Sequence, residues 1–133
     1  MSIDHVILGC SANKLEAEIA FLNAALSPLG IKEQFRVVPQ VVAFGNDEDK
    51  RFFWVSGLDR NQQPIEGDKP THIAFKAHDK DQIDAFHKAA METGGKDNGA
   101  PGPRKHYHAG YYGAFAISPA GNNIEAVIHN FVQ

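Results

Sequence analysis

The chain carries one local pattern twice, and this internal repeat limits the folds that it can adopt. His5 lies inside Ile-Asp-His-Val-Ile-Leu, and His72 lies inside Pro-Thr-His-Ile-Ala-Phe. A helical pattern follows each stretch and ends before a glycine, Gly30 in the first copy and Gly95 in the second. Such a repeat indicates two copies of one structural unit, so the two histidines are expected to occupy equivalent positions.

Alternating and β-branched residues predict the strands of both halves. The expected strands are 3–9, 34–38, 41–45, 51–55, 71–77, 111–117 and 123–129. Apolar residues at helical spacing predict one helix in each half, the first capped by Asn13 with Glu16 and the second by Asp79 with Gln82. Residues 97–107 are rich in glycine and proline and are expected to form an irregular loop.

The order in each half is a strand, a helix and then two or three strands. We therefore predict an α+β fold of two pseudo-symmetric modules, with a curved mixed sheet and the helices outside. Module one is expected to span residues 1–58 and module two residues 71–133, within one domain. Residues 59–70 are polar and contain glycine and proline, so they are predicted to be the linker.

Size and charge exclude several classes of protein. A chain of 133 residues fits one compact domain, and its formal charge of −3 gives no reason to expect a nucleic acid partner. No apolar run approaches the roughly 18 residues that cross a bilayer, so no membrane partner is expected. The first residues lack the basic and apolar segments of a secretory signal, and Cys10 is the only cysteine. A cytoplasmic location is the simplest expectation.

Strand alternation predicts a metal site. Side chains two residues apart share a face, so His5, His72 and Glu125 each lie opposite the fully apolar face of their strand. Because the apolar faces should pack on the helices, we expect the three side chains to converge on the concave side of the sheet. Two histidines and a carboxylate form a facial triad with positions open for water or substrate. A histidine beside apolar residues is also commonly a hydrogen-bonded structural group, and that interpretation stays open.

The two histidine-bearing strands and the closing segment 121–127 (Gly-Asn-Asn-Ile-Glu-Ala-Val) resemble the vicinal oxygen chelate superfamily. That superfamily includes glyoxalase I, extradiol dioxygenases, fosfomycin-resistance enzymes and bleomycin-resistance proteins. The resemblance covers essentially the whole chain and implies paired βαβββ modules whose sheets curl around a small-molecule cavity. It also implies metal ligands on the first and last strands of the modules, at positions that correspond to His5, His72 and Glu125.

The chain departs from the superfamily pattern in two places. Glyoxalase I has a fourth ligand, a carboxylate, near the position of Phe53-Trp54-Val55, where this chain has no acidic residue. The departure argues against glyoxalase I activity and fits either the three ligands of extradiol dioxygenases or members that bind ligands without metal. Ser118 stands where relatives commonly have the aspartate of Asp-Pro-x-Gly, and we expect that change to affect only the turn.

Residues 99–115 combine aromatic rings, imidazoles and glycines, a mixture typical of a small-ligand pocket. Arg104 is predicted to bind an anionic substrate, and Tyr107 or His108 to act as general acid or base. Glu125, if released from the metal, is a further candidate for the proton transfer. The remaining predicted substrate-binding residues are Trp54, Tyr112 and Asn123. The alternative for each of these residues is core packing or a solvated surface position.

The sequence leaves two functions open. The first is a metal-dependent lyase, isomerase or oxygenase that uses Fe, Mn, Ni or Zn on a small molecule with neighbouring oxygens. The second is a metal-free protein that sequesters a small molecule or antibiotic, as bleomycin-resistance proteins do. A regulatory role ranks below both. The expected partners are a small molecule and, from the resemblance, a second copy of the chain in a homodimer.

Overall fold

The computed structural model describes residues 3–132 and contains the same unit twice, as the repeat predicts. Met1, Ser2 and Gln133, the outermost residues of the predicted domain, lie outside the described residues. Module one contains β1 (Val6–Gly9), α1 (Leu15–Leu26), β2 (Lys32–Val38), β3 (Val41–Gly45) and β4 (Phe53–Ser56). Module two contains β5 (His72–Lys76), α2 (Lys80–Glu92), β6 (Lys96–Pro103), β7 (Tyr112–Ile117) and β8 (Asn123–Ile128).

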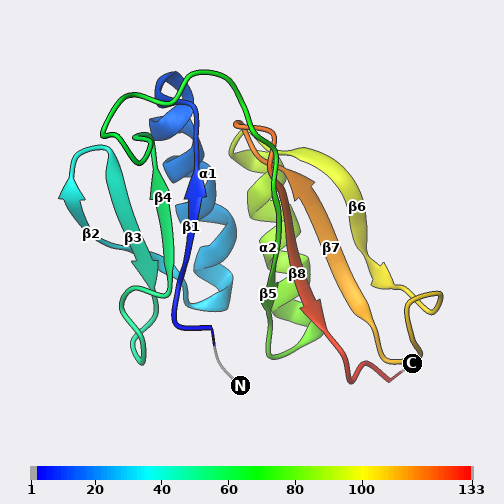
Figure 1. Cartoon of the computed structure of the whole chain (residues 1–133). Coiled ribbons are helices and arrows are strands. Elements are labelled where there is room, and N and C mark those ends of the chain that lie inside the picture. Colours follow the sequence, from blue (N-terminus) through cyan, green and yellow to red (C-terminus); the bar gives the residue numbers. More distant parts are fainter. Residues whose placement is uncertain (1–2, 133) are drawn as a thin grey trace.

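Each module forms its own four-stranded mixed sheet (Figure 1). The strand orders are β1-β4-β3-β2 and β5-β8-β7-β6, and in each sheet the first and last strands of the module pair in parallel. The α+β prediction with two repeated modules is therefore confirmed. The expected single sheet is instead two sheets, because β1 and β5 are edge strands that each pair on one side only. Neither described sheet closes into a barrel.

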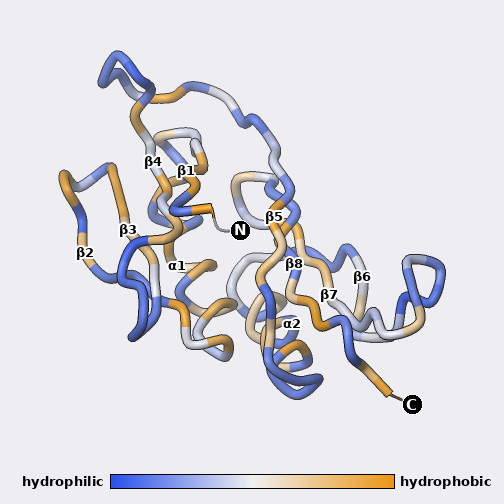
Figure 2. Tube along the Cα trace, turned by 60° about the horizontal axis from the view of Figure 1, so that its bottom comes forward, coloured by the Kyte–Doolittle hydropathy of each residue, from blue (hydrophilic) through white to orange (hydrophobic). Residues whose placement is uncertain are grey.

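The two helices pack against each other and against one face of the sheets, where the core lies. Phe53 of module one and Phe75 of module two meet in this core, with ring centroids 5.2 Å apart. The linker and the turn between β3 and β4 are mostly hydrophilic (Figure 2). No helix in residues 3–132 is long and apolar enough to cross a membrane.

Only the second of the two predicted helix caps forms. Asp79 accepts a hydrogen bond from the backbone N–H of Gln82, whose side chain accepts one from the backbone N–H of His78. The predicted cap by Asn13 and Glu16 is wrong, because Ala12–Lys14 is a short 3₁₀ helix and α1 begins only after it, without a side-chain cap.

The expectation of an irregular loop at 97–107 is wrong for its first half, where β6 forms. This strand pairs with β7 alone, and its register is interrupted between Asp97 and Gly99 and again between Gly99 and Gly102. An edge strand tolerates glycine and proline because one side of its backbone needs no partner in the sheet.

A buried carboxylate on α1 ties the two modules together. Glu18 has no exposed surface, and it accepts hydrogen bonds from the Ser118 hydroxyl (2.7 Å), the Ala120 backbone N–H (2.9 Å) and the Asn122 side-chain amide (2.9 Å). Asn122 in turn accepts from the backbone N–H of Thr71, just before β5. The expectation that Ser118 affects only its turn is therefore wrong, since its hydroxyl reaches into module one.

Candidate functional site

His72 and Glu125 meet on the face of the second sheet that the helices leave uncovered. His72 opens β5 and Glu125 lies in the middle of β8, and the Nε2 atom of His72 is 3.2 Å from the Oε1 atom of Glu125. Glu125 is only 2% exposed, whereas the side chain of His72 is 49% exposed. The expected approach of these two side chains is present within one chain.

The hydrogen bond on the other ring nitrogen of His72 fixes its tautomer. Nδ1 lies 2.9 Å from the backbone carbonyl oxygen of Asn123. A carbonyl oxygen can only accept, so Nδ1 carries a hydrogen, and in the neutral form of the ring Nε2 presents a lone pair. That lone pair and a carboxylate oxygen face each other, and only a proton or a metal ion between them makes the contact favourable.

Tyr111 holds the second oxygen of the same carboxylate. Its hydroxyl donates to Oε2 of Glu125, so each carboxylate oxygen has its own neighbour. Burial, followed by this hydrogen bond and the charge of Glu125, raises the pKa of Tyr111 above its ordinary value, so the phenol stays protonated as a donor. Gly113 makes the arrangement possible, because a Cβ atom there would lie 3.2 Å from Oε2.

His5 lies just before β1, in a hollow of about 410 Å³ that Ile7 and Trp54 also line. Its Nδ1 atom is 2.7 Å from a carboxylate oxygen of Asp4, which leaves Nε2 available, as in His72. Within residues 3–132, no three His, Cys, Asp or Glu side chains are close enough to hold one ion. The three predicted ligands therefore do not converge within the described part of one chain, because the modules form two sheets and His5 lies beside the other one.

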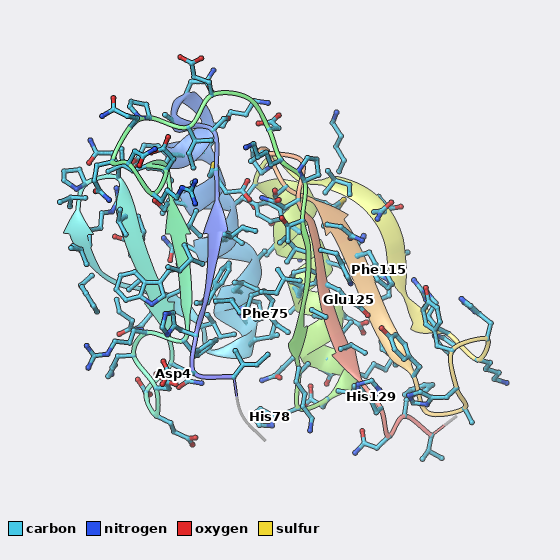
Figure 3. All side chains as sticks on the ribbon, viewed as in Figure 1. Asp4, Phe75, His78, Phe115, Glu125 and His129 are labelled. Atoms are coloured by element: carbon cyan, nitrogen blue, oxygen red, sulfur yellow. The ribbon has the colours of Figure 1, made fainter. Side chains whose placement is uncertain are left out.

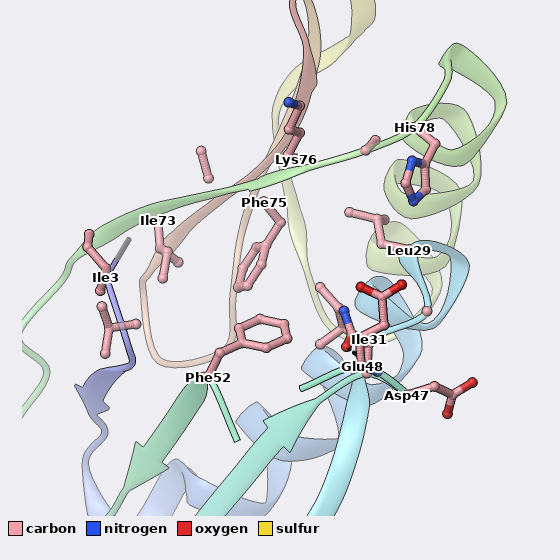
Figure 4. A pocket seen from close by; sticks show the side chains of 15 residues that line it. Ile3, Leu29, Ile31, Asp47, Glu48, Phe52, Ile73, Phe75, Lys76 and His78 are labelled. Carbon is pink, nitrogen blue, oxygen red and sulfur yellow. Dashed lines mark hydrogen bonds between the residues drawn. The ribbon is translucent and has the colours of Figure 1, made fainter. Parts of the chain in front are cut away.

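A cleft of about 830 Å³ lies between the modules (Figure 4). Phe52 of module one lines it opposite Ile73 and Phe75 of β5. His5, His72 and Glu125 do not line it. Ile73 and Phe75 project from β5 on the face opposite His72.

Two predicted catalytic residues lie near Glu125 without touching it. Tyr107 is 57% exposed, and its ring packs on that of Tyr111 with centroids 4.8 Å apart. The Nε2 atom of His108 lies 2.9 Å from Nδ1 of His129, at the end of β8. Figure 3 shows Phe115, Glu125 and His129 on this part of the second sheet.

The predicted substrate-binding residues lie in different surroundings. Tyr112 is buried and donates to Asp84 of α2, so its assignment to the substrate site is wrong: the side chain lies on the helix face of β7. The backbone carbonyl of Asn123 accepts a hydrogen bond from His72 Nδ1, and its side-chain oxygen accepts one from the side-chain amide of Asn98. Trp54 stands beside His5, with its indole N–H bonded to the carbonyl of Arg51.

Arg104 follows β6, with its guanidinium against backbone carbonyls and above the ring of Phe115. It lies on the face that carries Glu125, because Phe115 and Glu125 are direct partners across β7 and β8. Tyr111 is the residue that sequence reasoning missed. Alternation from Phe115 through Gly113 to Tyr111 could have placed its side chain on this face.

No family model matches the sequence, and no curated protein matches it either. Among solved structures, a glyoxalase/bleomycin resistance protein from Albidiferax ferrireducens T118 is 28% identical, with a TM-score of 0.75, and the match covers 94% of this chain and 97% of that chain. The chain fits the vicinal oxygen chelate superfamily.

More distant structures show the same fold of this superfamily. A lactoylglutathione lyase from Agrobacterium tumefaciens is 19% identical with a TM-score of 0.64, covering 95% of this chain and 92% of that one. A glyoxalase/bleomycin resistance protein/dioxygenase family enzyme from Burkholderia phytofirmans PsJN is 18% identical with a TM-score of 0.67. The match covers 99% of this chain and 100% of that chain. At these identities the likeness concerns the fold.

Proposed function

We propose that the protein is a divalent-metal enzyme, a lyase, isomerase or oxygenase, acting on a small molecule with neighbouring oxygen atoms. The observation that carries the proposal is the approach of His72 Nε2 to Oε1 of Glu125 at 3.2 Å, with Nδ1 of the same ring bonded to a carbonyl. Two donors that each bind an ion at about 2.1 Å, at right angles, lie about 3 Å apart. Histidine ligands commonly donate their other N–H to a carbonyl or carboxylate, as His72 does here.

We propose that His5 of a second copy supplies the third ligand. His5 shares the tautomer of His72, through its bond to Asp4, and it lies just before β1 beside Ile7 and Trp54. Apolar side chains on this sheet are unusually exposed, with Ile7 at 61% and Val37 at 64%. An apolar surface of this kind favours burial against another protein surface, and a homodimer would provide it.

A divalent ion bound there would polarise the oxygens of a substrate and stabilise negative charge that develops on them. The protein residues around it have defined tasks. Tyr111 keeps Oε2 of Glu125 occupied, so that Oε1 alone faces His72. Tyr107 and His108 are candidates to move a proton beside the substrate, as an exposed phenol and an imidazole on the same side of the sheet.

Metal content tests the proposal. Untagged protein, incubated with Zn(II), Mn(II), Ni(II) or Fe(II) and desalted, should retain about one ion per chain by elemental analysis. His72→Ala and Glu125→Ala should each retain almost none, because two of the three ligands cannot hold the ion through desalting. His106→Ala, at an exposed histidine outside the site, should match the wild type. Equal retention by all four proteins, or by none, would refute the proposal and favour a metal-free binder.

Replacing Tyr111 with phenylalanine should weaken metal binding roughly 10- to 100-fold, the usual cost of losing a residue that orients a ligand. Without the Tyr111 hydroxyl, the Glu125 carboxylate can rotate, so Oε1 is no longer held in position to bind the ion. Competition with a chromophoric chelator measures the affinity. Tyr107→Phe is the matched control, since the Tyr107 ring contacts Tyr111 and not the carboxylate. An equal loss in both variants would assign Tyr111 to packing alone.

A further inference from the structure

We propose that the substrate carries a carboxylate that Arg104 binds, beside the ion held by His72 and Glu125. This inference rests on the function proposed above and adds the chemical class of the substrate.

Phe115 connects Arg104 with the metal ligands. The guanidinium carbon of Arg104 lies 5.6 Å from the centre of the Phe115 ring, and that ring stacks with His72 at 6.2 Å between centroids. Phe115 is also the direct cross-strand partner of Glu125. The Arg104 guanidinium therefore lies on the same sheet face as His72 and Glu125, and the Phe115 ring lies between them (Figure 3 labels Phe115 and Glu125).

The guanidinium is fixed before any ligand arrives. Nη1 donates to the carbonyl of Gly102 at 2.8 Å, and Nη2 donates to the carbonyl of Ala100 at 2.7 Å. Gly99 and Gly102 leave the space that it fills, since a Cβ atom would lie 3.1 Å from Nη2 at the first and 3.2 Å from Nη1 at the second. A cation ordered in this way loses little side-chain entropy when it binds an anion.

No carboxylate neutralises this charge. In the described part of the chain, Arg36 forms ion pairs with Glu16 and Glu33, whereas Arg104 has no acidic partner within ion-pair distance. Asp97 is already occupied: the Gly99 N–H and then His87 bind it and lower its pKa, and Arg104 adds only a weaker effect of its charge.

A guanidinium has five N–H groups, and the carbonyls of Ala100, Gly102 and Pro103 occupy at most three. At least two remain for an anion. A planar carboxylate can accept from such a pair in a charge-assisted contact. We therefore expect the substrate to be a small carboxylic acid whose other oxygens reach the metal ion.

Two chelating probes test this expectation. Acetohydroxamate binds a metal ion through two neighbouring oxygens, and succinic acid monohydroxamate adds a carboxylate to the same chelator. Their affinities for the Zn(II)-loaded protein are measured by calorimetry. Wild-type protein should prefer the carboxylated probe about tenfold, the effect of one charge-assisted hydrogen bond.

Arg104→Gln should abolish this preference and leave the affinity for acetohydroxamate unchanged, which also shows that the metal ligands are intact. Arg104→Lys should keep part of the preference, and Lys105→Gln, the removal of the neighbouring exposed charge, should keep all of it. Metal-dependent binding of both probes with equal affinity by the wild type would overturn the inference alone. Failure of both probes to bind would overturn the proposed metal site as well.

Discussion

Replacing Ser118 with aspartate should lower the free energy of unfolding by about 3 kcal/mol, as an uncompensated buried charge does. The Ser118 hydroxyl donates to Oε2 of Glu18 at 2.7 Å, and both side chains are buried. Aspartate would place a second carboxylate against the first and remove a donor at the same time. Urea unfolding followed by circular dichroism measures the loss.

Two further variants separate charge repulsion from the lost hydrogen bond. Ser118→Ala removes only the donor and should cost about 1 kcal/mol. Adding Glu18→Gln to Ser118→Asp should recover part of the stability, because one carboxylate becomes an amide that can donate. If Ser118→Asp is no less stable than Ser118→Ala, the contact between Glu18 and Ser118 does not hold the modules together in solution.

Mixing two variants that each lack one metal ligand should restore a metal site if the ligands come from different copies of the chain. His5→Ala and His72→Ala should each bind almost no metal after passage through chelator-containing buffer. In a mixed dimer with the proposed geometry, one interface lacks both histidines and the other has His5, His72 and Glu125 together. We therefore expect one ion per mixed dimer, measured by elemental analysis after sequential purification through two different affinity tags.

The matched control mixes His72→Ala with Glu125→Ala, which remove ligands of the same module. Neither interface of that dimer is complete, so it should hold no ion. Equal metal content in both mixtures, or a chain that stays monomeric at the concentrations used, would contradict the shared site. Restoration in the first mixture alone would support it.

The repeat, the strand alternation and the second helix cap could be predicted from the sequence because they depend on neighbouring residues. Alternation places His72 and Glu125 on one face, and the structure brings them to 3.2 Å. Asp79 caps α2 through a residue only three positions away.

Other features depend on partners far apart in the chain, which a local pattern cannot supply. In the sequence, Ser118 fits an ordinary turn. Only the packing of α1 in the structure shows that the Ser118 hydroxyl donates a hydrogen bond to the buried Glu18 carboxylate. Tyr111 and Tyr112 look equivalent in sequence, yet one bonds Glu125 and the other bonds Asp84 of α2. The sequence predicts His5 as a ligand but does not show that the modules form two sheets, so it leaves open whether His5 acts in its own chain or in a second copy.

Anomalous X-ray diffraction from crystals soaked in Zn(II) tests most directly whether His72 and Glu125 form a metal site. We predict a peak within about 2.0–2.2 Å of both His72 Nε2 and Glu125 Oε1. The Tyr111 hydroxyl should remain on the other oxygen, and Nε2 of His5 from a second copy should complete the set. A zinc peak only at another position, such as between His108 and His129, with His72 still in direct contact with Glu125, would contradict the account.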